Sequence, residues 1–197
     1  MRARFPRLGG LILALTDEPA STRVWAQGAN GEQAVAQTIG VLPPESVLTL
    51  HDRRMRHEDG RLAQANIDHI AVTAAGVWVI DTKTHHGRLV VRRSGGLLRA
   101  RQERLYIRGR DQTDLVLGLA KQVTAVRREL EKLGDDVPVR GALCFVGTGL
   151  PWLGERIGDV PLVGPRRLAK LLKRDGPLSA EDRRRVAGLL DQRFPVR

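Results

Sequence analysis

The chain has 197 residues, of which 42% are hydrophobic and 28% are charged, so it is long enough for one domain with a proper core and too short for two comfortable ones. The 33 Lys and Arg residues outnumber the 22 Asp and Glu residues and give a formal charge of +11. This excess favours a polyanionic partner, nucleic acid before an anionic membrane surface, although a solvated basic exterior would also explain it.

The N-terminal stretch combines basic residues with the apolar run of residues 8–15, which is far too short to span a membrane. Asp17, Glu18 and Pro19 follow at once, and no small-residue cleavage site of an export signal is present. We therefore expect residues 1–27 to form an arm packed on the domain.

A helix is predicted over residues 29–39, because it follows Gly28 and ends by Gly40. Glu32 shares helical spacing with Val35 and Ile39, which places it on the apolar, inward face. The alternative is a partly exposed first-turn glutamate that favours the helix dipole. A short strand over residues 47–50 and a polar segment that ends in a turn at residues 59–60 follow.

Residues 66–83 have the pattern of a β-hairpin, with apolar runs at 67–72 and 77–80. Asp68, Asp81 and Lys83 interrupt these runs, and carboxylates among buried residues require compensation. A two-residue loop at residues 74–75 would set Asp68 opposite Asp81, with Lys83 on the same face. A three-residue loop would shift the register by one and break up the group.

Two carboxylates and an ammonium group on one patch suit Mg²⁺, which binds carboxylates, waters and substrate phosphate. We expect Mn²⁺ to be able to replace it. Asp68 and Asp81 would bind the metal, and Lys83 would orient the nucleophile or stabilise the transition state. The predicted chemistry is metal-assisted hydrolysis of a phosphodiester.

The region that follows the hairpin is basic. We expect a turn at residues 84–87, a strand at 88–93, a turn at 94–96 and a meander over 97–110. This meander would present a rim of arginines that holds phosphates beside the carboxylates: Arg88, Arg99, Arg101 and Arg104. An aromatic content of 4% disfavours a single-strand-binding module built on stacked bases.

A long helix is predicted over residues 114–133, and Gln122 lies on its apolar stripe. A buried Gln either bonds core backbone or reaches the site. Residues 139–146 are predicted to form a central strand that contains Cys144. This is the single cysteine of the chain, and so few cysteines are typical of a reducing, cytoplasmic compartment. A Gly-rich loop, an edge strand at 160–163 and helices over 164–174 and 179–193 complete the chain, with Ser179 as a helix cap.

Asp68 followed by Asp81-Thr82-Lys83 is similar to the D…(D/E)xK signature of the restriction-endonuclease-like nucleases, the PD-(D/E)xK superfamily. The chain also carries Gly28-x-x-Gly31-Glu32 before this signature and Gly87 after it. This ordered set resembles the nuclease-related domain (NERD) family over roughly residues 28–150. Asp81 stands where that family more often has Glu, and its shorter side chain still coordinates metal.

The resemblance and the order of elements imply an α/β fold, a three-layer restriction-endonuclease-like core with a mixed β-sheet flanked by helices. The core would span residues 28–163, with a helical segment at 164–197 packed on the same domain. The resemblance implies a Mg²⁺-dependent nuclease, with DNA favoured over RNA, in which Glu32 completes the acidic site and Gln122 supports catalysis. A non-catalytic nucleic-acid-binding domain and an interaction module are the alternatives.

Overall fold

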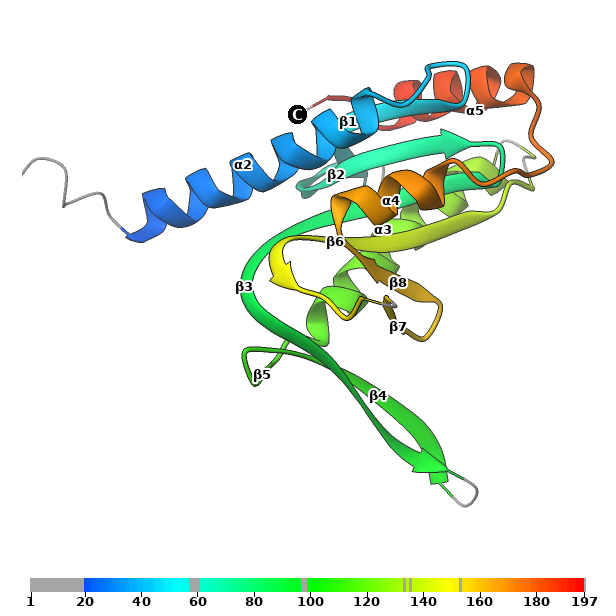
Figure 1. Ribbon diagram of the computed structural model, residues 1–197. Coiled ribbons are helices and arrows are strands. Elements are labelled where there is room, and N and C mark those ends of the chain that lie inside the picture. The colour runs from blue at the N-terminus through cyan, green and yellow to red at the C-terminus, as the bar shows by residue number, and fades with distance from the viewer. Residues whose placement is uncertain are drawn as a thin grey trace, which may run out of the picture.

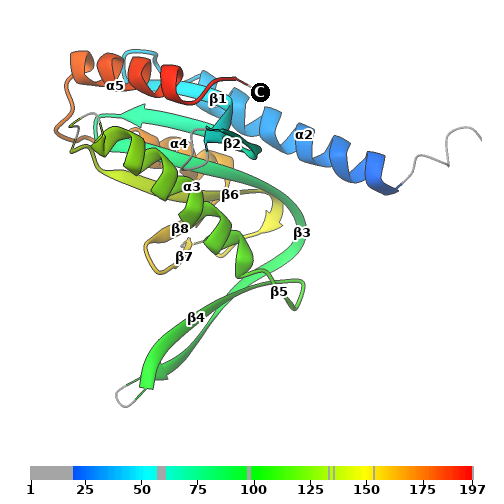
Figure 2. The same ribbon diagram turned by 180° about the vertical axis from the view of Figure 1, so that it is seen from behind.

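A computed structural model of the chain (Figure 1) describes residues 20–56, 61–96, 99–132, 134, 136–152 and 154–196. Within these residues, one mixed β-sheet is covered by helices on both faces, as the two opposite views in Figures 1 and 2 show. The predicted three-layer α/β architecture is confirmed. No helix of the described part is both long enough and apolar enough to cross a bilayer.

The sheet has antiparallel pairs at its two ends and parallel pairs in its middle. Its main strand order is β1-β2-β3-β6-β8-β7, and β4 pairs with β3 and β5 off this path. Strands β3, β6 and β8 run parallel, whereas β1, β2 and β3 are antiparallel. The elements are α2 (Ala20–Gly40), β1 (Val47–Arg56), β2 (Leu62–Thr73), β3 (Gly76–Gly96), β4 (Arg99–Ile107), β5 (Arg110–Asp111), α3 (Asp114–Glu131), β6 (Val139–Gly149), β7 (Glu155–Ile157), β8 (Val160–Val163), α4 (Pro165–Leu172) and α5 (Ala180–Arg193).

Each face of the sheet has its own apolar cluster. Val77 and Val79 of β3 pack with residues of α3 and α5, such as Leu119 and Leu190. Ile80 belongs instead to the cluster that includes α2 and α4. Because side chains alternate along a strand, odd-numbered residues in this part of β3 face α3 and even-numbered ones face α2. The central strand β6 contributes to both clusters, as its apolar pattern predicts.

Helix α2 begins at Ala20 and not at residue 29, so it includes the segment at 20–27 that was expected to be part of an arm. Residues 1–19, the rest of that predicted arm, lie outside the described residues. The two glycines of the GxxGE motif are therefore inside the helix. Glycine weakens a helix by about 1 kcal/mol relative to Ala, but it allows a close approach of backbone to a neighbour. Such an approach exists at Gly31, where a Cβ would overlap the side chain of Thr84 on β3.

Several predicted strand boundaries are wrong. Strand β1 continues to Arg56, where only residues 47–50 were expected, because its polar half pairs with β2 and is bridged at Arg53 by Val196. Strand β3 runs without interruption from Gly76 to Gly96, so the turns predicted at 84–87 and 94–96 are absent. An irregularity in its pairing with β6 between Thr84 and Gly87 bends it instead. The turn predicted at 59–60 lies outside the described residues.

The C-terminal half agrees better with the sequence pattern. Helix α3 ends at Glu131 and α4 at Leu172, each two residues before the predicted end. Ser179 caps α5 in a capping box with Asp182, as predicted. Strand β8 is not the edge of the sheet, because β7 forms within the predicted Gly-rich loop and pairs with it.

Candidate active site at a strand fork

The turn of the β2–β3 hairpin sets the register of the candidate site. Thr73 pairs with Gly76 and His69 with Ile80, which is the register of the two-residue loop. The hydroxyl of Thr73 stabilises this turn, since it donates to the Gly76 carbonyl at 2.9 Å and accepts from the Ala75 N–H at 3.2 Å. Continuing the same register by one pair sets Asp68 opposite Asp81.

The two carboxylates lie where β2 and β3 separate. The ladder between these strands ends at the His69–Ile80 pair, after which β2 pairs only with β1 and β3 with β6 and β4. The Asp68 carboxylate accepts a hydrogen bond from the Thr82 N–H at 2.7 Å. It thereby satisfies a backbone donor that has lost its partner strand. We call this position the fork, defined by Asp68, Asp81, Thr82 and Lys83.

Asp81 and Lys83 form an ion pair at the fork. The Lys83 Nζ lies 2.9 Å from each carboxylate oxygen of Asp81. The Asp81 side chain is 8% exposed and that of Lys83 is 27% exposed, so the carboxylate is enclosed while the ammonium group still reaches solvent. Both residues have the parity of Val79, which places them on the α3 side of the sheet. The pair fixes the position of the ammonium group beside Asp68.

The electrostatic environment of Asp68 is unfavourable for a charged carboxylate. Burial, and after it the charge of Asp81, raise the pKa of Asp68 to about 7. The Thr82 hydrogen bond and Lys83 act in the opposite direction. A smaller upward contribution comes from Glu32, which shows that the glutamate on α2 is close enough to act on the fork. Acidic groups from three elements therefore influence one another here.

Glu32 approaches the fork from the face opposite to α3. The neighbouring Gly31 packs against Thr82 and Thr84, whose even numbers place them on the α2 side of β3. This contact brings the middle of α2 close to the strand, and Glu32 is half-buried. The close packing at Gly31 is compatible with an inward-facing Glu32, and that orientation stays a prediction.

Gln122 lies on the inward stripe of α3, between the buried residues Leu119 and Val126. Its Oε1 is buried and has no hydrogen-bond partner among the described residues. Helix α3 covers the face of the sheet that carries Asp81 and Lys83. The unsatisfied amide oxygen is thus available to a ligand or water on that side, and the predicted supporting role of Gln122 stays a prediction.

The donor set of the fork fits Mg²⁺. Within the described residues, no three His, Cys, Asp or Glu side chains are grouped so that they alone could hold a metal ion. Mg²⁺ does not need such a group, because it keeps several waters and binds through one or two carboxylates and substrate phosphate. Asp68 and Asp81 supply two carboxylates. Burial and, after it, the charge of Asp81 raise the pKa of Asp68, and a bound cation would favour its charged form. A role of Glu32 as a further ligand stays a prediction.

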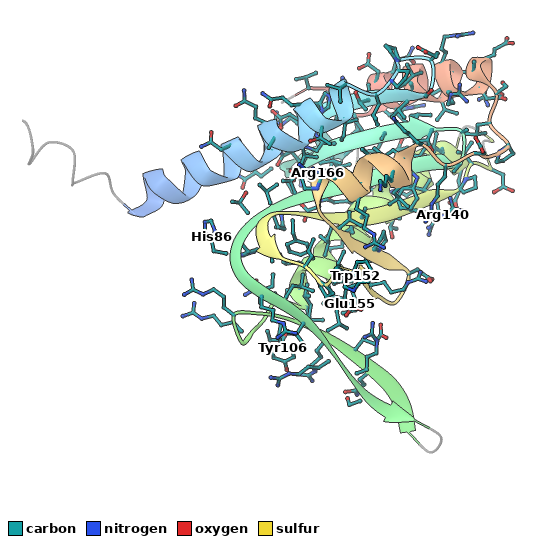
Figure 3. The ribbon with its side chains drawn as sticks, viewed as in Figure 1. His86, Tyr106, Arg140, Trp152, Glu155 and Arg166 are labelled. Atoms are coloured by element: carbon teal, nitrogen blue, oxygen red, sulfur yellow. The ribbon has the colours of Figure 1, made fainter. Side chains whose placement is uncertain are left out.

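The predicted arginine rim lies on the hairpin of β3 and β4. Arg88 and Arg104 are exposed there, while the side chains of Arg99 and Arg101 lie outside the described part of the structure. Figure 3 shows Tyr106 on this hairpin and His86 at the bend of β3 that leads to it. Arg92, which is not among the predicted rim residues, stacks on Tyr106 with its guanidinium carbon 4.4 Å from the ring centre. Alternation of exposed residues along β3 would have identified it.

His69 and His51 do not extend the site. His69 lies beside Asp68 but faces the α2 side, and it is 3% exposed. Its Nδ1 lies 2.8 Å from that of His51, and burial, followed by the charge of His51, lowers the pKa of His69 to about 4. His69 is therefore a neutral, packed residue at neutral pH.

A large hollow lies at another part of the sheet. It has a volume of about 1280 Å³ and is lined by residues of β3, α3, α4, β6 and the β7–β8 hairpin, among them Trp78, Arg140 and Glu155. No fork residue is among its lining residues. Shape alone would point to this hollow, but the paired carboxylates and the ammonium group that the chemistry requires are at the fork.

The chain matches the nuclease-related domain family over residues 27–146, a stretch that includes most of α2, the fork, the β3–β4 hairpin, α3 and most of β6. A search of curated proteins and a search of solved structures gave no match. The matched stretch covers more than half of the chain and holds Glu32, Asp68, Asp81 and Lys83 in the order that the resemblance requires. The chain therefore belongs to the nuclease-related domain (NERD) family.

Proposed function

We propose that the protein is a metal-dependent nuclease that hydrolyses phosphodiester bonds in nucleic acid, in DNA in preference to RNA. Mg²⁺ is the proposed cofactor, and Mn²⁺ is expected to replace it. The observation that carries the proposal is the fork itself, where the carboxylates of Asp68 and Asp81 meet an ammonium group that is fixed 2.9 Å from Asp81. Membership of a nuclease-related family and the charge of +11 support it.

Each residue of the fork has a distinct part in this proposal. A bound Mg²⁺ would supply Lewis acidity and neutralise charge on the phosphate. Asp68 and Asp81 hold the cation, and Asp81 also orients Lys83. The Lys83 ammonium group donates to a phosphate oxygen as negative charge develops on it. Water adds to phosphorus and gives up one proton to Glu32 or to solvent, the bond from phosphorus to one bridging oxygen breaks, and the leaving oxygen takes up a proton from solvent.

Glu32 and Gln122 act around this centre. Glu32, whose charge already acts on Asp68, is a further ligand for the cation or accepts a proton from the attacking water. Gln122 uses its free Oε1 to accept from that water. The exposed arginines of the hairpin hold phosphates of the substrate.

The proposal is tested by incubating the purified protein with supercoiled plasmid, linear DNA and RNA in the presence of Mg²⁺, Mn²⁺ or EDTA. We expect cutting with either metal and none with EDTA. Asp68→Asn, Asp81→Asn and Lys83→Ala should each lower the rate by about 100-fold or more, because each removes a group that acts on the developing charge. Asp159→Asn is the matched control, since this carboxylate is fully exposed and remote from the fork.

A second function, binding of nucleic acid without hydrolysis, is favoured by one observation. Lys83 is engaged with both oxygens of Asp81, so a cation must displace or share one of these contacts. If no substrate is cut with either metal while DNA is still bound, this second function replaces the first. If Asp68→Asn and Lys83→Ala stop cutting but leave binding intact, the first is supported.

A further inference from the structure

The part of β3 beyond its bend forms a projecting two-stranded ribbon with β4. Residues Leu89 to Gly96 of β3 pair antiparallel with β4, from Leu89–Ile107 to Gly96–Arg99. Pairing of β3 with β6 ends at Arg88, so this ribbon continues beyond the main sheet. Figures 1 and 2 both show it extending away from the helices. We call residues 89–96 and 99–107 the arm, which is distinct from the N-terminal arm that was expected over residues 1–27.

The arm has an apolar inner face and a basic outer face. Its inner residues belong to the core cluster that also contains α3 and α5, and they are buried: Leu89, Val91, Leu105 and Ile107. Two of its outer residues, Arg92 and Arg104, are positively charged. The outer residues alternate with the inner ones and are Val90, Arg92, Ser94, Gln102, Arg104 and Tyr106. All the outer residues except Tyr106 are exposed. The inner face anchors the arm, and the outer face is open to a partner.

Two arginines stand directly opposite each other on the outer face. Arg92 pairs with Arg104 in the register of the two strands. Like charges at directly opposed positions destabilise a strand pair. The guanidinium of Arg92 stacks on Tyr106, and Arg104 lies 3.5 Å from Asp111 in an exposed ion pair. One exposed carboxylate does not balance two arginines, so the charge is complementary to a polyanion.

The arm is held in a fixed direction by an ion-pair network on its inner side. Arg93 donates to Glu103 across the ribbon at 3.0 Å and to Glu155 of β7 at 2.7 Å. Glu103 in turn accepts from the Gly158 N–H in the β7–β8 turn at 2.5 Å. These bonds join both strands of the arm to the sheet edge. The outer face therefore has a set orientation relative to the fork, which lies earlier on the same strand.

The shape of the arm selects among polyanions. The major groove of B-form DNA admits a two-stranded β-ribbon, whereas the major groove of A-form RNA is too deep and narrow for side chains to enter. A single partly buried tyrosine is a poor platform for stacked bases of a single strand. We propose that the outer face of the arm binds in the major groove of double-stranded DNA. This inference rests on the proposed nuclease function and names duplex DNA as its substrate class.

The test is equilibrium binding of a labelled 20-base-pair DNA duplex, of the RNA duplex of the same sequence, and of a DNA duplex with bulky 5-substituted pyrimidines that fill the major groove. Binding is measured by fluorescence anisotropy in EDTA at several salt concentrations. We expect the wild-type protein to bind the plain DNA duplex at least about 10-fold more tightly than the other two. The double variant Arg92→Ala/Arg104→Ala should bind the plain DNA duplex about 10-fold or more weakly than the wild type. The slope of the logarithm of its binding constant against the logarithm of salt concentration should fall by the amount that roughly two phosphate contacts contribute.

The matched control is Arg166→Ala/Arg184→Ala, which removes the same charge from exposed positions on α4 and α5. Figure 3 shows Arg166 on the main body, away from the arm. The control should lose less than about 3-fold in affinity if the arm is the binding face. Equal losses in both double variants would overturn the inference, and so would equal binding of RNA or of groove-filled DNA. Thermal unfolding of the arm variant should match the wild type, since both arginines are exposed.

Failure of this inference and failure of the proposed function are distinguishable. A protein that cuts DNA with Mn²⁺ but binds duplexes independently of Arg92 and Arg104 would refute the arm and leave the fork intact. A protein that binds duplex DNA through the arm but cuts nothing would support the proposed role of the arm and refute the proposed hydrolysis. Absence of duplex binding by the wild-type protein overturns the inference, whatever the cutting assay gives.

Discussion

Replacing Asp68 by Asn should stabilise the metal-free protein at alkaline pH. The folded state raises the pKa of Asp68 from 3.8 to about 7, so the charged carboxylate is less favourable in the folded than in the unfolded chain. Below pH 3.8 the Asp68 carboxyl is protonated in both the folded and the unfolded chain, so it does not lower the free energy of unfolding. Between these two pKa values the unfolded state ionises first, and stability falls as pH rises. The full pKa shift corresponds to a loss of about 4 kcal/mol in the free energy of unfolding, which is an upper limit. Because Asp68 titrates together with Asp81, we expect Asp68→Asn to raise the free energy of unfolding by about 2 kcal/mol at pH 8.

The assay is urea unfolding of the wild-type protein and Asp68→Asn in EDTA at several pH values from 5 to 8. The stability difference in favour of Asn should grow with pH and level off above about pH 7. Asn retains an oxygen that accepts from the Thr82 N–H, so the comparison isolates the charge. Asp159→Asn should show no such pH dependence, since its side chain is fully exposed. A difference that stays constant with pH, or a variant that is less stable at pH 8, would refute the electrostatic description of the fork.

Three further predictions concern metal binding, helix packing and the buried thiol. Mn²⁺ should raise the melting temperature of the wild-type protein but not of Asp81→Asn, as seen by thermal unfolding, and an equal rise in both would place the metal elsewhere. Gly31→Ala should destabilise by about 1–3 kcal/mol, because the added methyl group overlaps Thr84, whereas Gly118→Ala, which meets no atom, should stabilise by about 0.5–1 kcal/mol. Urea unfolding of both variants checks this, and equal effects would contradict it. Cys144 is buried, which raises its pKa to about 12, so a thiol reagent should label it only after unfolding; fast labelling of native protein would contradict this.

The sequence reduced the register of the hairpin to two alternatives, a two-residue and a three-residue loop, because the turn and the apolar pattern allow few others. Only the two-residue loop places Asp68, Asp81 and Lys83 on one face, and that loop is present. The capping box of α5 is equally local, since Ser179 and Asp182 form it by themselves. Features that depend on residues close in sequence can therefore be predicted from the sequence.

Features that depend on tertiary contacts could not be predicted from the sequence. The polar half of β1 has no alternation to mark it as a strand, and it is ordered by pairing with β2 and by the C-terminal bridge at Val196. The length of β3 was missed because the glycine at 87 suggested a turn, while its actual effect is to make room for Arg108 at a bend. The hydrogen bond from Thr82 to Asp68 arises from the separation of two strands, which no local pattern indicates.

The most direct test of the proposed site is the anomalous scattering of a crystal soaked in Mn²⁺. If the fork is a metal centre, a peak should lie between the carboxylates of Asp68 and Asp81, and Lys83 should have moved away from at least one oxygen of Asp81. The peak should disappear in Asp68→Asn/Asp81→Asn. A crystal in which Mn²⁺ binds elsewhere, with the Lys83–Asp81 pair unchanged, would contradict the assignment of these carboxylates as the metal ligands.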